Sequence, residues 1–205
     1  MSKRKTTTFP LEWGQVKKLE GQLLMTFMET ERPQDGVNLL QITLGCRFGL
    51  RVSDLMSLRW KDVVNLHDGD DMVVRERKTN KLRLIRITHK VRTIVSTVYN
   101  ILDPNPSHFI FTSNKGKGLS PMSVQNFNLR LRTTLDQYGI RVKGNPSSHC
   151  LRKTFVVQSI RRGFQSGDHL SLVKVSHLIN HSSVSQTVKY TNYETMEMMD
   201  LYELD

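Results

Sequence analysis

Four residues in the last third of the chain have side chains suited to chemistry on a phosphodiester. They lie within residues 145–193 and are, in order, His149, Arg152, His181 and Tyr190. Arginine binds two phosphate oxygens with its planar fork, histidine donates or accepts a proton near neutral pH, and a tyrosine hydroxyl can act as a nucleophile. None of the four is diagnostic alone. The pattern becomes informative only if the rest of the chain supplies the missing partners.

Two basic residues earlier in the chain lie at predicted turns. Arg51 follows Gly49 and directly precedes a short helical pattern, and Lys78 separates two β-rich runs, 72–77 and 82–87, that predict a hairpin. Taken singly, Arg51 would more often be a surface or capping arginine, and Lys78 a solvated turn lysine. Only a joint pattern with the later residues favours a functional interpretation.

The elements that must position these residues are mostly helical. Apolar spacing predicts helices over residues 11–28, 37–46, 89–102 and 123–138, followed by three more in residues 147–190. His149 and Arg152 are three apart on one of these helices, so both side chains can reach one ligand. The short apolar run Phe109–Phe111 predicts a third strand beside the hairpin. We therefore expect an α+β fold that is mainly helical, with a small antiparallel three-stranded sheet.

The charge of the chain favours a polyanionic partner. The net charge is +11, and residues 194–205 carry five acids and no base, so that 30 bases stand against 14 acids in residues 1–193. Phosphate contacts are expected from four basic residues, although an ordinary solvated basic face explains any one of them equally well: Lys115, Lys117, Arg130 and Arg132. Residues 1–8 are expected to form a flexible basic leader, and residues 194–205 a tail with an apolar edge.

Several classes of protein are disfavoured by composition. The sequence has neither an apolar run long enough for a membrane span nor an apolar segment after its basic N-terminus that would indicate a secretory signal. Its two cysteines, Cys46 and Cys150, are not in a CxxC pair and are expected to be buried free thiols. We expect no disulfide framework, no metal and no cofactor, and a cytoplasmic location.

Laid out in order, the candidate residues resemble the catalytic domain of the tyrosine recombinases, the phage-integrase family. The stretch GLRVSDLMSLRWKDV is similar to the family's first box, KTNK to the turn that bears its lysine, HCLRKTF to its His-x-x-Arg box, and LINHSSVSQTVKYTNY to its last box. The resemblance covers residues 9–193. It implies the catalytic residues Arg51, Lys78, His149, Arg152, His181 and Tyr190, with Asp54 as a supporting acid.

The resemblance implies a site-specific DNA recombinase of the integrase type, which cleaves and rejoins strands through a 3′-phosphotyrosine. The implied partners are double-stranded DNA, further copies of the chain in a tetramer on DNA, and accessory DNA-bending proteins, in a bacterial or phage-encoded system. One alternative is an enzyme resembling the type IB topoisomerases, which relaxes DNA by the same chemistry. Another is a non-catalytic DNA-binding module of the same fold, for which the basic body would suffice.

Two features depart from the family pattern, and one residue competes for a role. Asn180 stands where the family usually has glycine, and nothing corresponds to the N-terminal core-binding domain of full-size members, so the chain is either a short recombinase or a fragment. Tyr193 lies one helical turn beyond Tyr190. The nine-residue spacing from His181 to Tyr190 matches the family, whereas the spacing to Tyr193 does not. The acidic tail is interpreted either as a frayed helix or as an element that docks on a neighbouring protomer.

Overall fold

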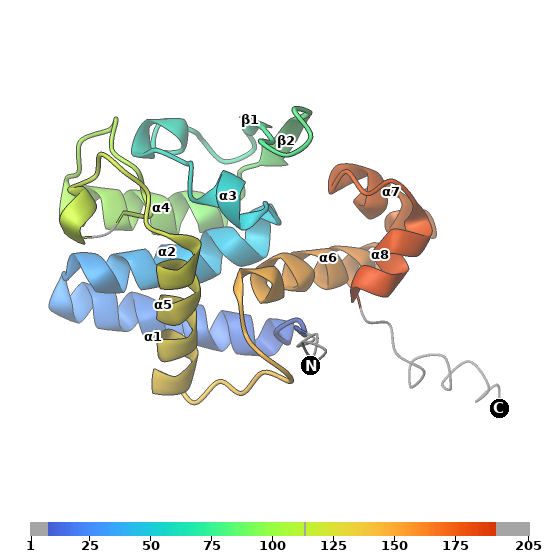
Figure 1. The fold of residues 1–205 in the computed structure, drawn as a ribbon, viewed down its shortest axis with the longest axis horizontal. Coiled ribbons are helices and arrows are strands. Elements are labelled where there is room, and N and C mark those ends of the chain that lie inside the picture. The colour runs from blue at the N-terminus through green and yellow to red at the C-terminus, as the bar shows by residue number, and fades with distance from the viewer. Residues whose placement is uncertain (1–7, 113, 192–205) are drawn as a thin grey trace, which may run out of the picture. The chain divides into compact units, whose positions relative to one another are not determined.

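The computed structural model describes residues 8–112 and 114–191, which form two compact units (Figure 1). The first unit extends to Phe155, and the second begins at Val156. Helix α6 (Ser148–Gln165) contributes to both. Each unit is described by itself below.

The first unit is mainly helical with one β-hairpin. Its helices are α1 (Trp13–Thr30), α2 (Pro33–Phe48), α3 (Val52–Leu55), α4 (His89–Leu102) and α5 (Val124–Gln137), with 3₁₀ turns η1 (Trp60–Asp62) and η2 (Asn114–Gly116). The hairpin pairs β1 (Asp71–Arg75) with β2 (Leu82–Arg86), antiparallel, with Val73 opposite Leu84. The predicted helices and the hairpin are confirmed.

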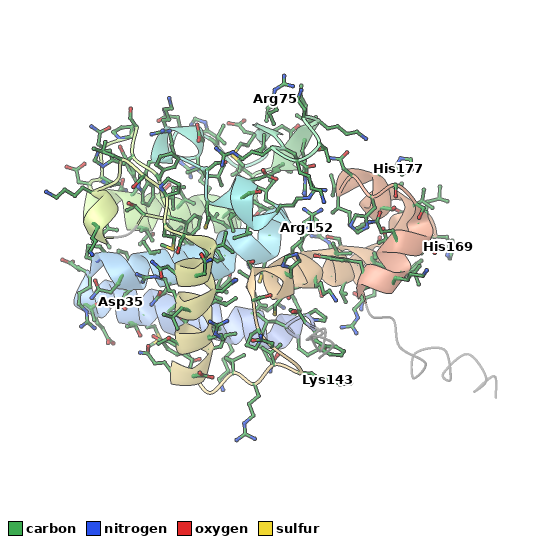
Figure 2. All side chains as sticks on the ribbon, in the orientation of Figure 1. Asp35, Arg75, Lys143, Arg152, His169 and His177 are labelled. Carbon is green, nitrogen blue, oxygen red and sulfur yellow. The ribbon has the colours of Figure 1, made fainter. Side chains whose placement is uncertain are left out.

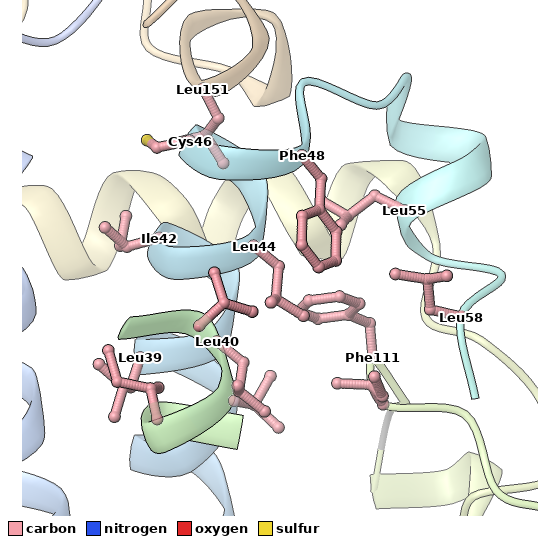
Figure 3. Close-up of a cluster of buried hydrophobic side chains, with 14 of the residues drawn as sticks. Leu39, Leu40, Ile42, Leu44, Cys46, Phe48, Leu55, Leu58, Phe111 and Leu151 are labelled. Atoms are coloured by element: carbon pink, nitrogen blue, oxygen red, sulfur yellow. The ribbon is translucent and has the colours of Figure 1, made fainter. Parts of the chain in front are cut away.

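Helix α2 is the centre of the first unit. Pro33 occupies its first turn, where the missing N–H costs nothing, and Gly49 ends it in the left-handed conformation, with φ of 57°. The helix is buried over most of its length and packs beside α1, with α4 and α5 against it (Figure 1). Leu39, Leu40 and Leu44 therefore lie in the main cluster of apolar side chains (Figure 3).

The predicted third strand is wrong. The described residues contain a sheet of two strands only, and Phe109 instead forms an isolated bridge with Arg59, outside that sheet. The physical reason is packing of the adjoining residues. Ile110 and Phe111 are fully buried, and the ring of Phe111 meets that of Phe127 on α5 edge-on, with centroids 5.5 Å apart. The apolar run is thus used to fill the helical core.

The second unit contains the end of α6 with α7 (Ser171–Leu178) and α8 (Val184–Thr191). Close packing of α6 against the start of α7 depends on Gly163, because a Cβ there would lie 1.9 Å from the Ser171 hydroxyl oxygen. Helices α7 and α8 contact each other directly. The connection between them, residues 179–183, carries His181.

The structure also bears on the expectations about membrane spans and cysteines. Among residues 8–112 and 114–191, no helix is both long and apolar enough to cross a membrane. Cys46 and Cys150 are buried free thiols, as expected, and burial raises the pKa of the Cys150 thiol to about 12.

Candidate active site

Two of the candidate arginines, about a hundred residues apart in sequence, converge on the turn that follows α2. Arg51 is the residue before α3, at the end of this turn. Arg152 lies near the start of α6 (Figure 2), is only 5% exposed, and donates from Nη1 to the carbonyl oxygen of Gly49 over 2.6 Å. The contact fixes Arg152 beside the backbone that carries Arg51.

A third arginine, Arg83, completes this cluster and was not among the sequence candidates. It lies on the buried face of β2, 3% exposed, and donates to the carbonyl oxygens of Phe48 and Gly49. Burial, and then the positive charge of Arg152, lower its pKa to about 10. The sequence carried one signal for the burial of Arg83. In the strand alternation Arg83 shares the phase of Ile85 and Ile87, and both isoleucines are buried in the structure. Leu82 and Leu84, which suggest the opposite phase, are exposed.

Gly49 should tolerate no side chain. Its φ of 57° is strained for other residues, and a Cβ would lie 2.1 Å from Cδ1 of Phe155. We expect Gly49→Ala to lower the free energy of unfolding by about 3 kcal/mol, the sum of the backbone strain and the overpacking. Denaturant unfolding of purified protein measures it.

Gly69→Ala is the matched control for this prediction. Gly69 also has positive φ, 88°, but nothing lies within 4 Å of its Cβ position, so only the backbone cost of about 1 kcal/mol applies. In a Phe155→Ala background, Gly49→Ala should lower the free energy of unfolding by less than it does in the wild type, and so by an amount closer to that for Gly69→Ala. Equal losses for the two glycine variants would contradict the steric argument.

Two buried carboxylates lie beside these arginines. Asp54, the predicted supporting acid, is fully buried, and its Oδ1 accepts from the backbone N–H of Arg77 at 3.0 Å. The carboxylate that contacts Arg51 is a different one, Glu76, which accepts from Arg51 Nη1 at 2.6 Å. Glu76 was missed because acids in a hairpin are usually solvated. Its place in the strand alternation after Met72 and Val74 was the available signal.

Lys78 and His149 lie at the surface of the first unit. Lys78 is exposed in the turn between β1 and β2, as the sequence predicts. His149 is also exposed, yet the surrounding protein displaces part of its water. That desolvation, followed by the charges of Arg152 and Lys153, lowers the pKa of His149 below its usual value. The imidazole is therefore uncharged at neutral pH and able to accept a proton.

The second unit brings His181 and Tyr190 together. Their rings meet edge-on with centroids 5.2 Å apart, and the Tyr190 hydroxyl oxygen is buried. Nδ1 of His181 is hydrogen-bonded to the hydroxyl of Thr187 at 2.9 Å, which restrains the orientation of the ring. Thr187 was not a sequence candidate. The sequence offered only the spacing of three residues between Thr187 and Tyr190, which places both on one face of α8.

Asn180 adopts the conformation for which glycine is suited. Its φ is 56°, in the left-handed region, at the end of the turn that follows α7. Asparagine is among the residues that tolerate this region best. The departure from the family pattern at this position is therefore compatible with the local backbone.

The four candidate DNA contacts differ in what they can do. Lys115 and Lys117 are exposed in the loop before α5. Arg130 is half-buried and donates to the Gln34 carbonyl and the Asn38 side chain, and burial lowers its pKa. It is committed to internal contacts, and with Lys115 it lines an open hollow of about 710 Å³. Arg132 is also half-buried.

Other polar residues fall outside the site. His169 and His177 are both exposed (Figure 2). Tyr193 and the acidic tail lie outside the described residues, as does the leader up to residue 7. Within the part of the chain that the structure describes, no group of three or more His, Cys, Asp or Glu could hold a metal ion.

Comparison with known proteins shows which family the chain belongs to. The model of the phage integrase family matches residues 15–197, and the chain belongs to that family. Among curated relatives, the tyrosine recombinase XerC of Bradyrhizobium diazoefficiens is 31% identical over 156 residues, covering 75% of this chain and 45% of the relative. XerC of Mesorhizobium japonicum is 28% identical over 193 residues, covering 92% and 55%. The chain thus spans about half the length of these relatives.

Solved structures show the same fold. The XerH site-specific recombinase, in a post-cleavage complex with a palindromic difH substrate, matches with a TM-score of 0.69 at 17% identity, covering 96% of this chain and 53% of that chain. The XerA recombinase also matches with a TM-score of 0.69, at 20% identity, covering 97% and 65%.

Proposed function

We propose that the chain is the catalytic part of a site-specific DNA recombinase that cleaves and rejoins strands through a 3′-phosphotyrosine. The observation that carries the proposal is the convergence of Arg51 and Arg152 on the turn after α2, with a third arginine behind them. Arginine forks match the oxygens of phosphate and carboxylate groups, and several of them together suit the additional negative charge of the phosphorane that forms from a phosphodiester. Membership of the phage integrase family supports it.

The arginines would stabilise the charge that develops on phosphorus. Each presents a planar fork to non-bridging oxygens, and donors already held in place cost no reorganisation when the reaction occurs. Arg152 is held by the Gly49 carbonyl and Arg51 by Glu76, so neither fork needs to search for its position. His181, whose ring is oriented by the contact of Nδ1 with Thr187, would add a hydrogen bond to the same phosphate group.

The proposed cleavage step is balanced by two proton transfers. The Tyr190 oxygen forms a bond to phosphorus as the bond from phosphorus to the 5′-oxygen breaks. The tyrosine proton passes to His149, whose lowered pKa leaves it uncharged at neutral pH, and Lys78 donates a proton to the departing 5′-oxygen. The reverse step with the 5′-hydroxyl of another strand rejoins the DNA. The phosphotyrosine conserves the energy of the broken phosphodiester bond, so the cycle requires no ATP.

The assembly that we propose follows from exchange between two DNA sites. Four protomers would act on two sites in the cytoplasm, with accessory DNA-bending proteins. Residues 194–205 would dock on a neighbouring protomer, because an acidic segment with an apolar edge complements a basic body. Residues 1–8 would contact the phosphate backbone outside the site.

A nicked suicide substrate tests the proposal. The nick lets a short 5′-hydroxyl strand diffuse away after cleavage, so the enzyme should accumulate as a covalent adduct with the cognate DNA site. Denaturing gels detect the adduct, and mass spectrometry of the nucleotide-linked peptide should place it in residues 184–191. Tight, salt-dependent binding of the site without any adduct would instead favour the non-catalytic DNA-binding module.

A further inference from the structure

Glu76 is a buried carboxylate at the boundary between strand β1 and the turn that carries Lys78. Its side chain is fully buried, and its Oε2 accepts two hydrogen bonds, from Arg51 Nη1 at 2.6 Å and from the Thr79 hydroxyl at 2.8 Å. Its Oε1 lies 3.8 Å from Nη1 of Arg83. One carboxylate oxygen therefore joins a phosphate-binding arginine to the residue next to Lys78.

A charged residue at this position needs an explanation. In the alternation of β1, Met72 and Val74 face the core, and Glu76 has the same phase, where an apolar residue would avoid the cost of burying a charge. A simple role as counter-ion to the arginine cluster would account for its charge. It would not require the second hydrogen bond, from Thr79, to the same oxygen.

The turn around Lys78 is held on both sides. The N–H of Arg77, before it, donates to the buried Asp54 side chain, and the hydroxyl of Thr79, after it, donates to Glu76. The backbone of Glu76 also pairs with the turn, because Asn80 N–H donates to its carbonyl over 2.8 Å. Lys78 itself is exposed, so its side-chain direction depends on these backbone anchors.

We propose that Glu76 is a positioning residue that couples the Arg51 fork to the turn bearing Lys78, so that the phosphate clamp and the proton donor are oriented together. One arm of the coupling is the ion pair with Arg51, and the other is the hydrogen bond from Thr79. The inference rests on the proposed function, in which Lys78 protonates the leaving oxygen. Loss of the ion pair with Arg51 should weaken the phosphate clamp, and loss of the hydrogen bond from Thr79 should weaken proton donation by Lys78.

A pair of suicide substrates separates the two arms. In the first, the leaving atom is the ordinary 5′-oxygen; in the second, a bridging sulfur replaces it, and a thiolate leaves without a proton because a thiol is far more acidic than an alcohol. Loss of proton donation slows cleavage of the first substrate only. Loss of the phosphate clamp slows cleavage of both.

Thr79→Val removes the hydroxyl that links Glu76 to the turn and leaves the ion pair with Arg51 intact. We expect it to slow adduct formation on the oxygen substrate by about tenfold and on the sulfur substrate by less than about threefold, in line with the loss of one hydrogen bond to a charged group. Thr79→Ser, which keeps the hydroxyl, should behave as wild type. Thr79 is only partly buried, so these variants test the coupling even if changes at Glu76 unfold the protein.

Glu76→Gln keeps the shape of the side chain and removes its charge. We expect slower adduct formation on both substrates, by about tenfold or more, because the Arg51 fork loses its ionic partner. Asp71→Asn is the matched control: Asp71 begins β1, the strand that Glu76 directly follows, and pairs with Arg86 at the exposed surface, so its replacement should leave both rates unchanged.

The outcomes distinguish the coupling from the proposed function. Wild-type rates for Thr79→Val on the oxygen substrate, or equal slowing on both substrates, would overturn the coupling while the recombinase assignment stands. A wild-type protein that forms no adduct with either substrate would overturn the proposed function itself, and the coupling with it.

Discussion

Tyr190→Phe should form no covalent adduct at all on a suicide substrate that traps the wild-type protein. The substitution removes one hydroxyl and keeps the ring, which packs edge-on against His181 at 5.2 Å, so the second unit should fold normally. Without the nucleophilic oxygen, no phosphotyrosine forms, and the rate should fall below detection. Binding of the uncleaved site should be retained, because phosphate contacts come from other residues.

Tyr193→Phe is the control, since it removes the same atom from the competing tyrosine. It should form the adduct at close to the wild-type rate. If Tyr193→Phe abolished the adduct and Tyr190→Phe did not, the assignment of the nucleophile would be reversed. The recombinase chemistry would then stand with a twelve-residue spacing from His181.

Arg152→Lys should slow adduct formation by about 10²- to 10³-fold while the protein still binds its site. Lysine keeps the positive charge but loses the planar fork, and removal of one preorganised donor from a developing oxyanion commonly has an effect of this size. The hydrogen bond to the Gly49 carbonyl is also lost, so the free energy of unfolding should fall by about 1 kcal/mol. Single-turnover gels and denaturant unfolding measure the two effects separately.

Arg162→Lys provides the comparison on the same helix. Arg162 lies in the last turn of α6 and is exposed, so its replacement should change neither the rate nor the stability measurably. An Arg152→Lys rate within threefold of wild type would show that charge alone suffices at this position. The role of the Gly49 contact in holding a fork would then be wrong.

The helical body and the hairpin could be predicted from sequence because their signals are local. The apolar spacing of α1, the proline and glycine that bound α2, and the turn residues around Lys78 each specify structure within a few residues. The pairing partner of Phe109–Phe111 could not be read in this way. A short apolar run is equally suited to forming a strand and to filling a core. Which of the two it does here depends on contacts with α5, which is distant in sequence.

The candidate site divides along the same line. Arg51, Lys78, His149, Arg152, His181 and Tyr190 could be proposed from the sequence because their types and order form a chemical pattern that resembles the family's boxes. Their supports could not. Glu76, Arg83 and Thr187 act through contacts that depend on which face of a strand or helix is buried, and leucines at 82 and 84 made the phase of β2 ambiguous.

The shared acceptor at the turn after α2 has a consequence for how such a site changes during evolution. Arg83 and Arg152 are both oriented by a main-chain oxygen at position 49, which no amino-acid substitution removes. Substitutions can therefore replace most of the surrounding side chains and still leave the carbonyl oxygen that accepts hydrogen bonds from both guanidinium groups. The constraint falls on backbone shape, and so on the glycine and on the ring of Phe155 packed over it. Among divergent homologues, position 49 should accordingly remain glycine wherever position 155 carries an aromatic ring.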